Sequence, residues 1–243
     1  MTGPTLTTTA AAAPWAFELV GGVEGERSMS LAVWRFVRPL LAVSSAPLGG
    51  GMGERAWIVN AQVPHSYDRT DPDAHLLELA SARRLGGPGV GMLTAVDVRD
   101  IVRAEDAGAL AEVSVGVTLP TWAAAPDDAG DDAVRDAVPA GRGRPAPGHG
   151  GGRVGTINVV GFVPERLAPA ALVNAVMTVT EAKAQALWDA GIAATGTASD
   201  ALCVVCPAEG TAHDFGGPRS SWGARLARAV HRAVLDGCRS AQA

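Results

Sequence analysis

The order of the predicted elements in this 243-residue sequence favours an α+β domain with a largely antiparallel or mixed β-sheet covered by helices. Helices do not alternate strictly with strands, as a doubly wound parallel fold would require. Apolar runs predict three strands before the first helix and three more before the second, whereas a single strand precedes the last helix. We therefore expect one domain over residues 15–237, flanked by a disordered tail at 1–14 and a short tail at 238–243.

Turn residues mark the ends of the elements in the N-terminal half. Apolar runs between glycine-rich turns predict strands at 15–20, 31–37 and 57–63. Asp71 can cap the first helix, Pro72 suits its first position, and Gly86 and Gly87 should stop it. Further strands are expected at 91–98 and 112–119, the second with its aliphatic residues on one face.

The C-terminal half contains a segment, residues 123–152, that can bury little apolar surface. Val134 and Val138 are its only sizeable aliphatic residues, so we expect a flexible insertion inside the domain. Regular elements then return as a strand at 155–163, a helix at about 169–190, a strand from the 195–206 segment and a helix at about 221–235.

Composition and charge argue against several classes of protein. The net charge of -5 and the scattered basic residues do not suggest a nucleic-acid partner. The N-terminus lacks the basic and leucine-rich regions of a secretory signal, and no run approaches about 18 apolar residues, so we expect no membrane span. Three cysteines in a chain of this length do not make a disulfide framework. These observations predict a soluble cytoplasmic protein.

The cysteines and histidines do not predict a metal site. Cys203 and Cys206 match a C-x-x-C motif, but residues three apart in a strand point to opposite faces, so we interpret both as buried inert thiols. Cys238 is expected at the surface. The five histidines show no zinc-ligand spacing. Among them only His213, beside Asp214, is a plausible general base, and the alternative is an exposed loop histidine.

Two sets of polar residues fit either a site or ordinary structure. The 169–190 helix carries a polar stripe that could form the wall of a site or a solvated face, made of Asn174, Thr178, Glu181 and Gln185. Lys183 falls among the apolar residues of this helix. A buried hydrogen-bond network or a ligand contact would equally explain the polar residues in and after two strands, which are Asn158, Asn60, Gln62, Tyr67, Asp68 and Arg69.

Seven blocks of the sequence, in order, resemble the adenosylcobinamide amidohydrolase family. The resemblance covers nearly all of the chain outside the tail and the insertion, and no single block decides it. The blocks are "SSAPLGGG" (44–51), "NAQVPHSYDRTDP" (60–72), "GVGMLTAVDV" (89–98), "GTINVV" (155–160), "NAVMTVTEAKAQAL" (174–187), "TGTASDALCVVC" (195–206) and "FGGPRSSWGARLARAV" (215–230).

The resemblance implies hydrolysis of the amide that joins aminopropanol to a side chain of the corrin ring. The products would be adenosylcobyric acid and 1-amino-2-propanol, which return salvaged corrinoid to coenzyme B12 synthesis. Cobalt and the adenosyl group would then belong to the substrate, and no cofactor of the protein itself is expected. The expected partner is this corrinoid, and homo-oligomers are possible.

Amide hydrolysis needs a nucleophile, donors for the oxyanion and an acid for the leaving amine. We expect Asp200, at the mouth of its strand, to act as the general base or to orient the base, and Glu181 to be its partner and to protonate the amine. Thr197 and Thr195 would hold the carbonyl oxygen, and Asn158 would align the amide. The full set of expected substrate contacts is Ser44, Ser45, Asn60, Gln62, Tyr67, Asp68, Arg69, Asn158, Asn174, Lys183, Thr195 and His213.

Two other classes of function stay open at this point. The chain could be a corrinoid-binding or regulatory module without catalysis. It could also be an acyl hydrolase that uses a threonine or serine nucleophile on a different small amide, with Thr197 or Ser45 as the candidate. In the amidohydrolase mechanism itself, Ser44 and Ser45 are rival nucleophiles.

Overall fold

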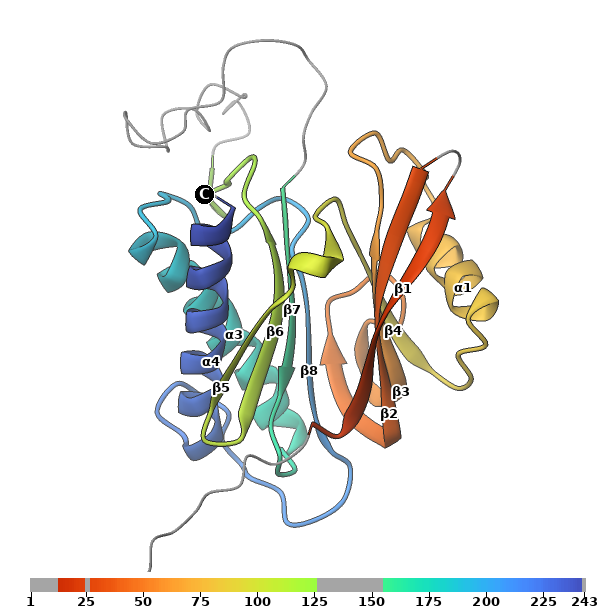
Figure 1. Cartoon of the computed structure of the whole chain (residues 1–243). Coiled ribbons are helices and arrows are strands. Elements are labelled where there is room, and N and C mark those ends of the chain that lie inside the picture. Colours follow the sequence, from red (N-terminus) through yellow and green to blue (C-terminus); the bar gives the residue numbers. More distant parts are fainter. Residues whose placement is uncertain (1–12, 25–26, 126–154, 242–243) are drawn as a thin grey trace, which may run out of the picture.

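A computed structural model describes residues 13–24, 27–125 and 155–241 of the chain (Figure 1). The helices in these ranges are α1 (Pro72–Ala82), α3 (Pro169–Asp189) and α4 (Ser221–Ser240), with a short 3-10 turn at Val98–Asp100. The strands are β1 (Trp15–Glu24), β2 (Arg27–Ser44), β3 (Gly51–Gln62), β4 (Gly89–Thr94), β5 (Val102–Asp106), β6 (Ala109–Gly116), β7 (Thr156–Phe162) and β8 (Ala201–Pro207).

The strands form one mixed sheet of eight strands, in the order β4-β3-β2-β8-β7-β6-β5 with β1 paired to β2. Two neighbouring pairs are parallel, β3 with β4 and β7 with β8, and the other pairs are antiparallel. The predicted α+β class with a mixed sheet is therefore confirmed.

Strand β2 bends the sheet into two stacked layers. Its pairing register with β3 shifts between Arg35 and Leu40, a stretch that contains Pro39. Before the shift β2 pairs with β1, and after it β2 pairs with β8. One layer therefore holds β1, β3, β4 and the first half of β2, and the other holds β5 to β8.

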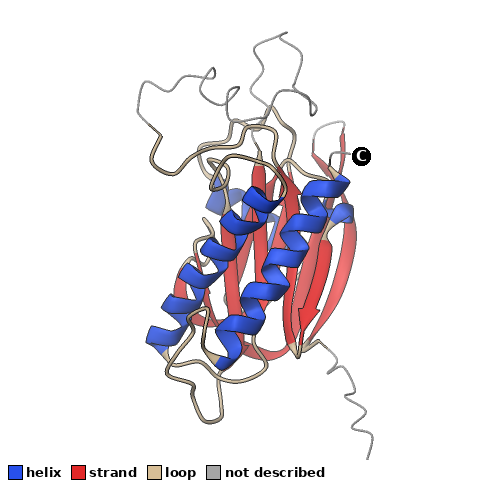
Figure 2. Cartoon of the chain, turned by 90° about the vertical axis from the view of Figure 1, so that its left-hand side faces the viewer, coloured by secondary structure: helices blue, strands red, loops and turns tan. Residues whose placement is uncertain are grey.

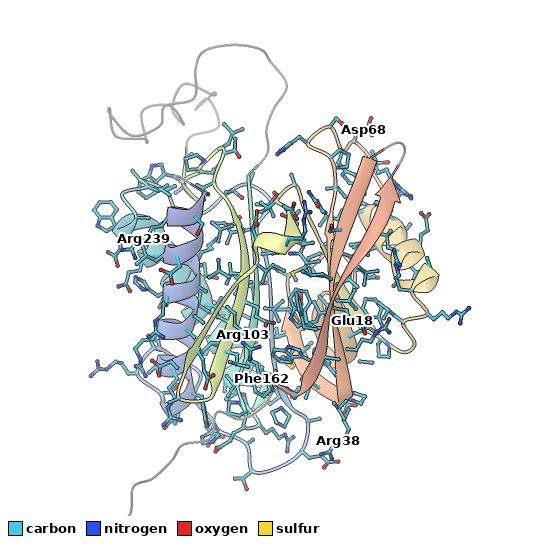
Figure 3. All side chains as sticks on the ribbon, in the orientation of Figure 1. Glu18, Arg38, Asp68, Arg103, Phe162 and Arg239 are labelled. Atoms are coloured by element: carbon cyan, nitrogen blue, oxygen red, sulfur yellow. The ribbon has the colours of Figure 1, made fainter. Side chains whose placement is uncertain are left out.

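Three apolar clusters hold four layers together. Trp34 and Ile58 of the first sheet layer meet Phe162 and Cys203 of the second in the cluster between the sheets. Helices α3 and α4 cover the outer face of the second layer (Figure 2). Helix α1 covers the outer face of the first layer, where Leu76 is fully buried. The side chains fill the space between the ribbons in Figure 3.

All the predicted strands and helices are present, but several boundaries differ from the prediction. Strand β2 runs over Arg27–Ser44 and not 31–37, and α4 ends at Ser240 and not at about 235, so it enters the tail predicted at 238–243. Helix α1 begins at Pro72 as expected, but Asp71 makes no capping hydrogen bond because its carboxylate accepts from Arg69 at 2.9 and 2.8 Å. Strand β5 (Val102–Asp106) was not predicted, since it is only five residues long and three of them are charged. Strand β6 is buried on both faces because it lies between α4 and the other sheet layer.

Two of the three cysteines lie as predicted, and the third does not. Cys203 and Cys206 are both buried and lie on opposite faces of β8, as expected. Burial raises the pKa of the Cys203 thiol to about 12. The prediction for Cys238 is wrong, because this residue is 1% exposed and packs in the cluster between α3, α4 and the sheet.

Other predictions lie wholly or partly outside the described residues. These are the first twelve residues of the tail predicted at 1–14 and residues 126–152 of the insertion predicted at 123–152. Within the described ranges, no helix is long and apolar enough to cross a membrane.

Candidate active site

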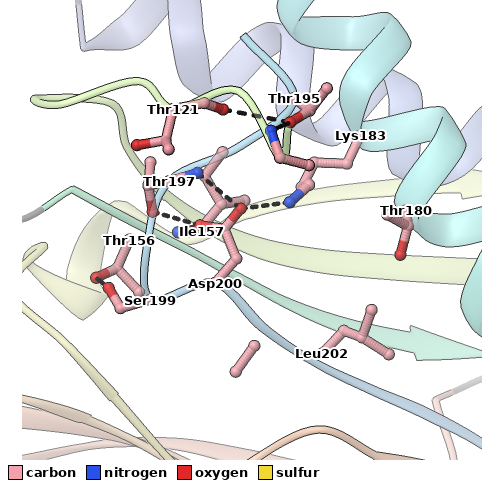
Figure 4. Close-up of polar contacts among 12 residues, drawn as sticks. Thr121, Thr156, Ile157, Thr180, Lys183, Thr195, Thr197, Ser199, Asp200 and Leu202 are labelled. Atoms are coloured by element: carbon pink, nitrogen blue, oxygen red, sulfur yellow. Dashed lines mark hydrogen bonds and ion pairs between the residues drawn. The ribbon is translucent and has the colours of Figure 1, made fainter. Parts of the chain in front are cut away.

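The turn that leads into β8 places the carboxylate of Asp200 against the amine of Lys183 (Figure 4). Lys183 reaches the carboxylate from α3, and Thr197 lies on its other side. Both charged side chains are shielded, with 12% of Lys183 and 13% of Asp200 exposed. The "TGTASD" turn thus brings a carboxylate, an ammonium group and a hydroxyl together at the mouth of the strand.

Four donors surround the carboxylate of Asp200. Its Oδ1 accepts from the backbone N–H of Ile157 at 2.8 Å and from the hydroxyl of Thr197. Its Oδ2 accepts from the backbone N–H of Thr197 at 3.0 Å and from Lys183 Nζ. A carboxylate has about four lone-pair sites, so these contacts occupy them all. Thr197 supplies the only hydroxyl on this carboxylate within the described part of the chain.

Gly196 covers this pair with backbone alone. A Cβ at this position would lie 2.3 Å from Asp200 Oδ2 and 2.5 Å from Lys183 Nζ. The backbone N–H of Thr121 donates to the Gly196 carbonyl at 2.8 Å, and the hydroxyl of Thr195 accepts from the backbone N–H of Ala123 at 2.8 Å. The turn is thereby tied to the chain that follows β6.

A second group of hydroxyls lies beside Thr197. The Gly155 carbonyl lies 2.8 Å from the hydroxyl of Thr197 and accepts from the hydroxyl of Ser199 at 3.0 Å. Ser199 Oγ also lies 2.8 Å from Thr156 Oγ1. The threonine hydroxyl can turn its single proton toward Asp200 or toward Gly155, so it can be held in place and also give the proton to Asp200.

Glu181 does not pair with Asp200 as expected. Residues two apart on a helix point about 200° away from one another, and here Lys183 faces β8 whereas Glu181 is exposed on the side of α4. Glu181 and Gln185 line a hollow of about 510 Å³ between α3 and α4. The partner of Asp200 is Lys183. Lys183 lies among the apolar positions of α3, and its long aliphatic stem crosses this buried face so that its amine reaches the carboxylate.

Asn60 and Asn158 lie in a buried network between the two sheet layers. Both are 1% exposed, and Asn158 Nδ2 donates to Asn60 Oδ1 at 2.9 Å and to the Leu93 carbonyl at 2.8 Å. Asn60 Nδ2 donates to Ser114 Oγ at 3.0 Å. Of the two open interpretations, the structure therefore favours the buried network. Gln62, at the end of β3, is half-buried.

The other polar residues after β3 lie on the α1 side of the molecule. Tyr67 stacks on His75, with Oη 3.0 Å from Nδ1, and Arg69 pairs with Asp71 and Glu78. These contacts tie the loop after β3 to α1.

Asp68, between Tyr67 and Arg69, is exposed at the edge of the molecule (Figure 3). None of these three residues has a described contact with Asp200 or Lys183.

Ser44 and Ser45 lie beside β8 and contact Leu202, which follows Asp200 by two residues. The Ser44 hydroxyl donates to the Leu202 carbonyl at 2.8 Å and accepts from the Ala46 N–H at 3.1 Å. Ser45 is exposed, and its oxygen accepts from the Leu202 N–H at 3.1 Å. Ser45 therefore keeps a proton for which the described residues offer no acceptor.

His213 and Asn174 lie at a different place, where α4 begins. They line a hollow of about 500 Å³ together with Arg219 and Ser221. The carboxylate that contacts His213 is Glu165 and not the neighbouring Asp214.

Hydrogen bonds from His213 and Trp222 hold the pKa of Glu165 below its usual value. The local sequence gave no signal for this pairing, since the two residues are 48 positions apart.

Nearly the whole chain matches one protein family. The family model described as "Adenosylcobinamide amidohydrolase" matches residues 16–243. The chain belongs to the adenosylcobinamide amidohydrolase family. The family is that of a hydrolase that acts on an amide bond and takes a corrinoid substrate, in keeping with corrinoid salvage and vitamin B12 biosynthesis.

One of the individual relatives carries the name of this family. The adenosylcobinamide amidohydrolase of Methanosarcina mazei is 26% identical over 202 residues, which cover 79% of this chain and 88% of the relative. An uncharacterized protein of Methanocaldococcus jannaschii is 32% identical over 91 residues, 34% of this chain and 35% of the relative. A crystal structure of a Pyrococcus horikoshii OT3 protein aligns with a TM-score of 0.41 and 11% identity, covering 88% of this chain and 77% of that one.

No three His, Cys, Asp or Glu side chains in the described residues are grouped to hold a metal ion. The groups that meet at the mouth of β8 are a carboxylate, an ammonium group and hydroxyls, which is a set that can transfer protons and attack a carbonyl carbon.

Proposed function

We propose that the protein hydrolyses the amide between the corrin side chain and aminopropanol in adenosylcobinamide, giving adenosylcobyric acid and 1-amino-2-propanol. The observation that carries this proposal is the contact chain from Thr197 through Asp200 to Lys183. It offers a nucleophile, a base and an acid in direct contact, as amide hydrolysis requires.

The saturated carboxylate favours Thr197 over a water molecule as the first nucleophile. A water would need a vacant lone pair on Asp200, and the four described donors leave none. The hydroxyl of Thr197 already contacts Oδ1, so its proton is the one that Asp200 can take.

Thr197 Oγ1 bonds to the amide carbon as its proton passes to Asp200. Lys183 protonates the amine nitrogen as the carbon–nitrogen bond breaks, and 1-amino-2-propanol leaves. Asp200 returns the proton to Lys183 across their contact.

Esterification of Thr197 removes its O–H, which frees a position on Oδ1 for a water. That water gives a proton to Asp200 and hydrolyses the ester, and the proton restores the threonine hydroxyl. Oxyanion donors are the backbone N–H groups of Ala198 and Ser199, which meet no acceptor in the described residues.

The test uses Thr197→Val, which removes the hydroxyl and keeps the shape and all other donors to Asp200. Adenosylcobinamide is incubated with the protein and the products are separated by chromatography. The parent should form both products in equal amounts, and Thr197→Val should lose on the order of 10³-fold or more in turnover. Thr197→Ser should retain measurable turnover because it keeps the nucleophilic oxygen.

Ser45→Ala is the matched control, since it removes a neighbouring exposed hydroxyl. Parent-like turnover by folded Thr197→Val would refute the threonine mechanism, and loss in Ser45→Ala instead would move the nucleophile to Ser45.

A corrinoid-binding module is the second candidate, because a saturated carboxylate also suits a purely structural clamp. It predicts stoichiometric uptake of adenosylcobinamide by the parent protein with neither product formed.

A further inference from the structure

We infer that Asn60 and Asn158 are positioning residues: Asn158 holds the start of β8 beside Asp200, Asn60 anchors Asn158 from the opposite sheet layer, and neither contacts the substrate. This inference rests on the proposed function, because it concerns the same carboxylate. It begins from the buried network between the layers, which the proposed reaction does not use directly.

The parallel strands β7 and β8 are joined at their mouth by side chains. Their ladder begins at the pair Asn158 and Ala201. One residue earlier the backbone N–H of Ile157 donates to Asp200 Oδ1 at 2.8 Å. In return the backbone N–H of Ala201 donates to Asn158 Oδ1 at 3.2 Å. Each strand thus caps the other, and Asp200 and Asn158 are the two capping side chains.

The Asn158 cap is itself anchored in the other layer. Its Nδ2 donates to Asn60 Oδ1 at 2.9 Å and to the Leu93 carbonyl at 2.8 Å. Asn60 belongs to β3 and Leu93 to β4, whereas Asn158 belongs to β7. The orientation of the Asn158 amide, and so the position of the Ala201 backbone, is therefore set by residues of the first sheet layer.

Asn60 is fixed in turn by Ser114. Asn60 Nδ2 donates to Ser114 Oγ at 3.0 Å, so both ends of its amide are used. Asn60, Ser114 and Asn158 are each 1% exposed, which leaves no surface for a corrinoid to touch. The path runs from Ser114 through Asn60 and Asn158 to Ala201, the residue that follows Asp200.

The path has a catalytic consequence because the proposed reaction depends on short distances at Asp200. Loss of the anchor lets the start of β8 shift, and misplacement by about 1 Å can cost about 10²-fold in rate. The effect should fall on kcat, since none of these side chains is open to the substrate.

The experiment compares Asn60→Ala with Asn60→Asp and with the control Glu112→Gln. Asn60→Ala removes the acceptor for Asn158, whereas Asn60→Asp keeps it. Glu112 is a matched control because it is 5% exposed and also joins the layers, through Trp34, but has no described contact with β8. Ser114→Ala is the milder variant, used if Asn60→Ala does not fold. Each variant is measured for kcat, KM, the pH profile of kcat and the midpoint of thermal unfolding, with adenosylcobinamide as substrate.

We expect Asn60→Ala, or Ser114→Ala in its place, to lower kcat by roughly 10- to 10²-fold with KM within a few-fold of the parent. Asn60→Asp should recover most of the lost turnover, because it keeps the acceptor for Asn158. Glu112→Gln should keep the kcat of the parent.

Two results would overturn the inference. One is a parent-like kcat in folded Asn60→Ala or Ser114→Ala, and the other is an equal loss in Glu112→Gln, which would indicate general destabilisation. Thr197→Val, run in parallel, separates this failure from that of the proposed function. If Thr197→Val is inactive and the Asn60 variants are not impaired, the positioning role alone is wrong.

Discussion

Replacement of Gly196 by alanine should separate Lys183 from Asp200 without removing either charge. The added Cβ would lie 2.3 Å from Asp200 Oδ2 and 2.5 Å from Lys183 Nζ. Ordinary contacts begin at about 3.4 Å, so each side chain has to withdraw by about 1 Å. Both atoms end flexible side chains, and therefore the turn can keep its backbone path while the pair opens.

Two consequences follow for the Gly196→Ala variant. Turnover should fall by about 10²-fold, because the acid and the base no longer touch. The free energy of unfolding should fall by about 1–3 kcal/mol, the usual loss when a shielded polar contact is impaired. Adenosylcobinamide turnover and urea unfolding measure the two effects. Gly86→Ala is the matched control, because a Cβ there meets nothing within 4 Å.

The reasoning is refuted if Gly196→Ala and Gly86→Ala are indistinguishable in turnover and stability. It is also refuted if Gly196→Ala loses stability alone, since the pair would then be a structural clamp without a role in the reaction.

Three further predictions concern groups away from this turn. Burial raises the pKa of Glu112 above the ordinary glutamate value of 4.5, so the folded protein holds this proton more tightly than the unfolded chain. Stability should therefore fall as the pH rises through and above that value, and Glu112→Gln should flatten this slope in urea titrations; an unchanged slope would contradict it. Cys203→Ala should cost about 1 kcal/mol of stability and no turnover, and a folded but inactive variant would instead make this thiol part of the reaction. Chelators should not inhibit the turnover of adenosylcobinamide. Activity that is lost to a chelator and restored by zinc would contradict this expectation.

Patterns along the chain predict the architecture well because they report local burial. The start of α3 at Pro169 follows from the preference for proline at the first helical position, and the opposite faces of Cys203 and Cys206 follow from the alternation of side chains along a strand. The two sheet layers cannot be predicted from local patterns, because the bend within β2 depends on which strands pair with each half of β2. The burial of Cys238 could not be predicted for the same reason, because no local pattern indicates that α4 packs on α3.

The candidate site is predictable in part. An acid at the mouth of an apolar strand pointed to Asp200, and the helical net placed Lys183 on the buried face of α3, where it meets that strand. The charge of Glu181 on the polar stripe favours this residue as the partner. However, residues two apart on a helix point about 200° away from one another, so Glu181 cannot face β8 when Lys183 does. Whether Asn60 is a ligand contact or part of a network depends on strands far apart in the chain, so no local pattern could decide it.

The bent strand β2 also has a consequence for the order in which the chain can fold during synthesis. The first half of β2 pairs with β1 and β3, which are close in the sequence. Its second half also pairs with β3, but its other neighbour is β8, and the Ser44 hydroxyl donates to a carbonyl 158 residues later. Contacts of such separation form slowly, because a long loop has to close first. On the ribosome, the nascent chain therefore exposes the apolar inner face of its first layer until residues 201–207 emerge. The same late strand completes the site at Asp200, so a truncated product that lacks it should combine exposed apolar surface with no activity.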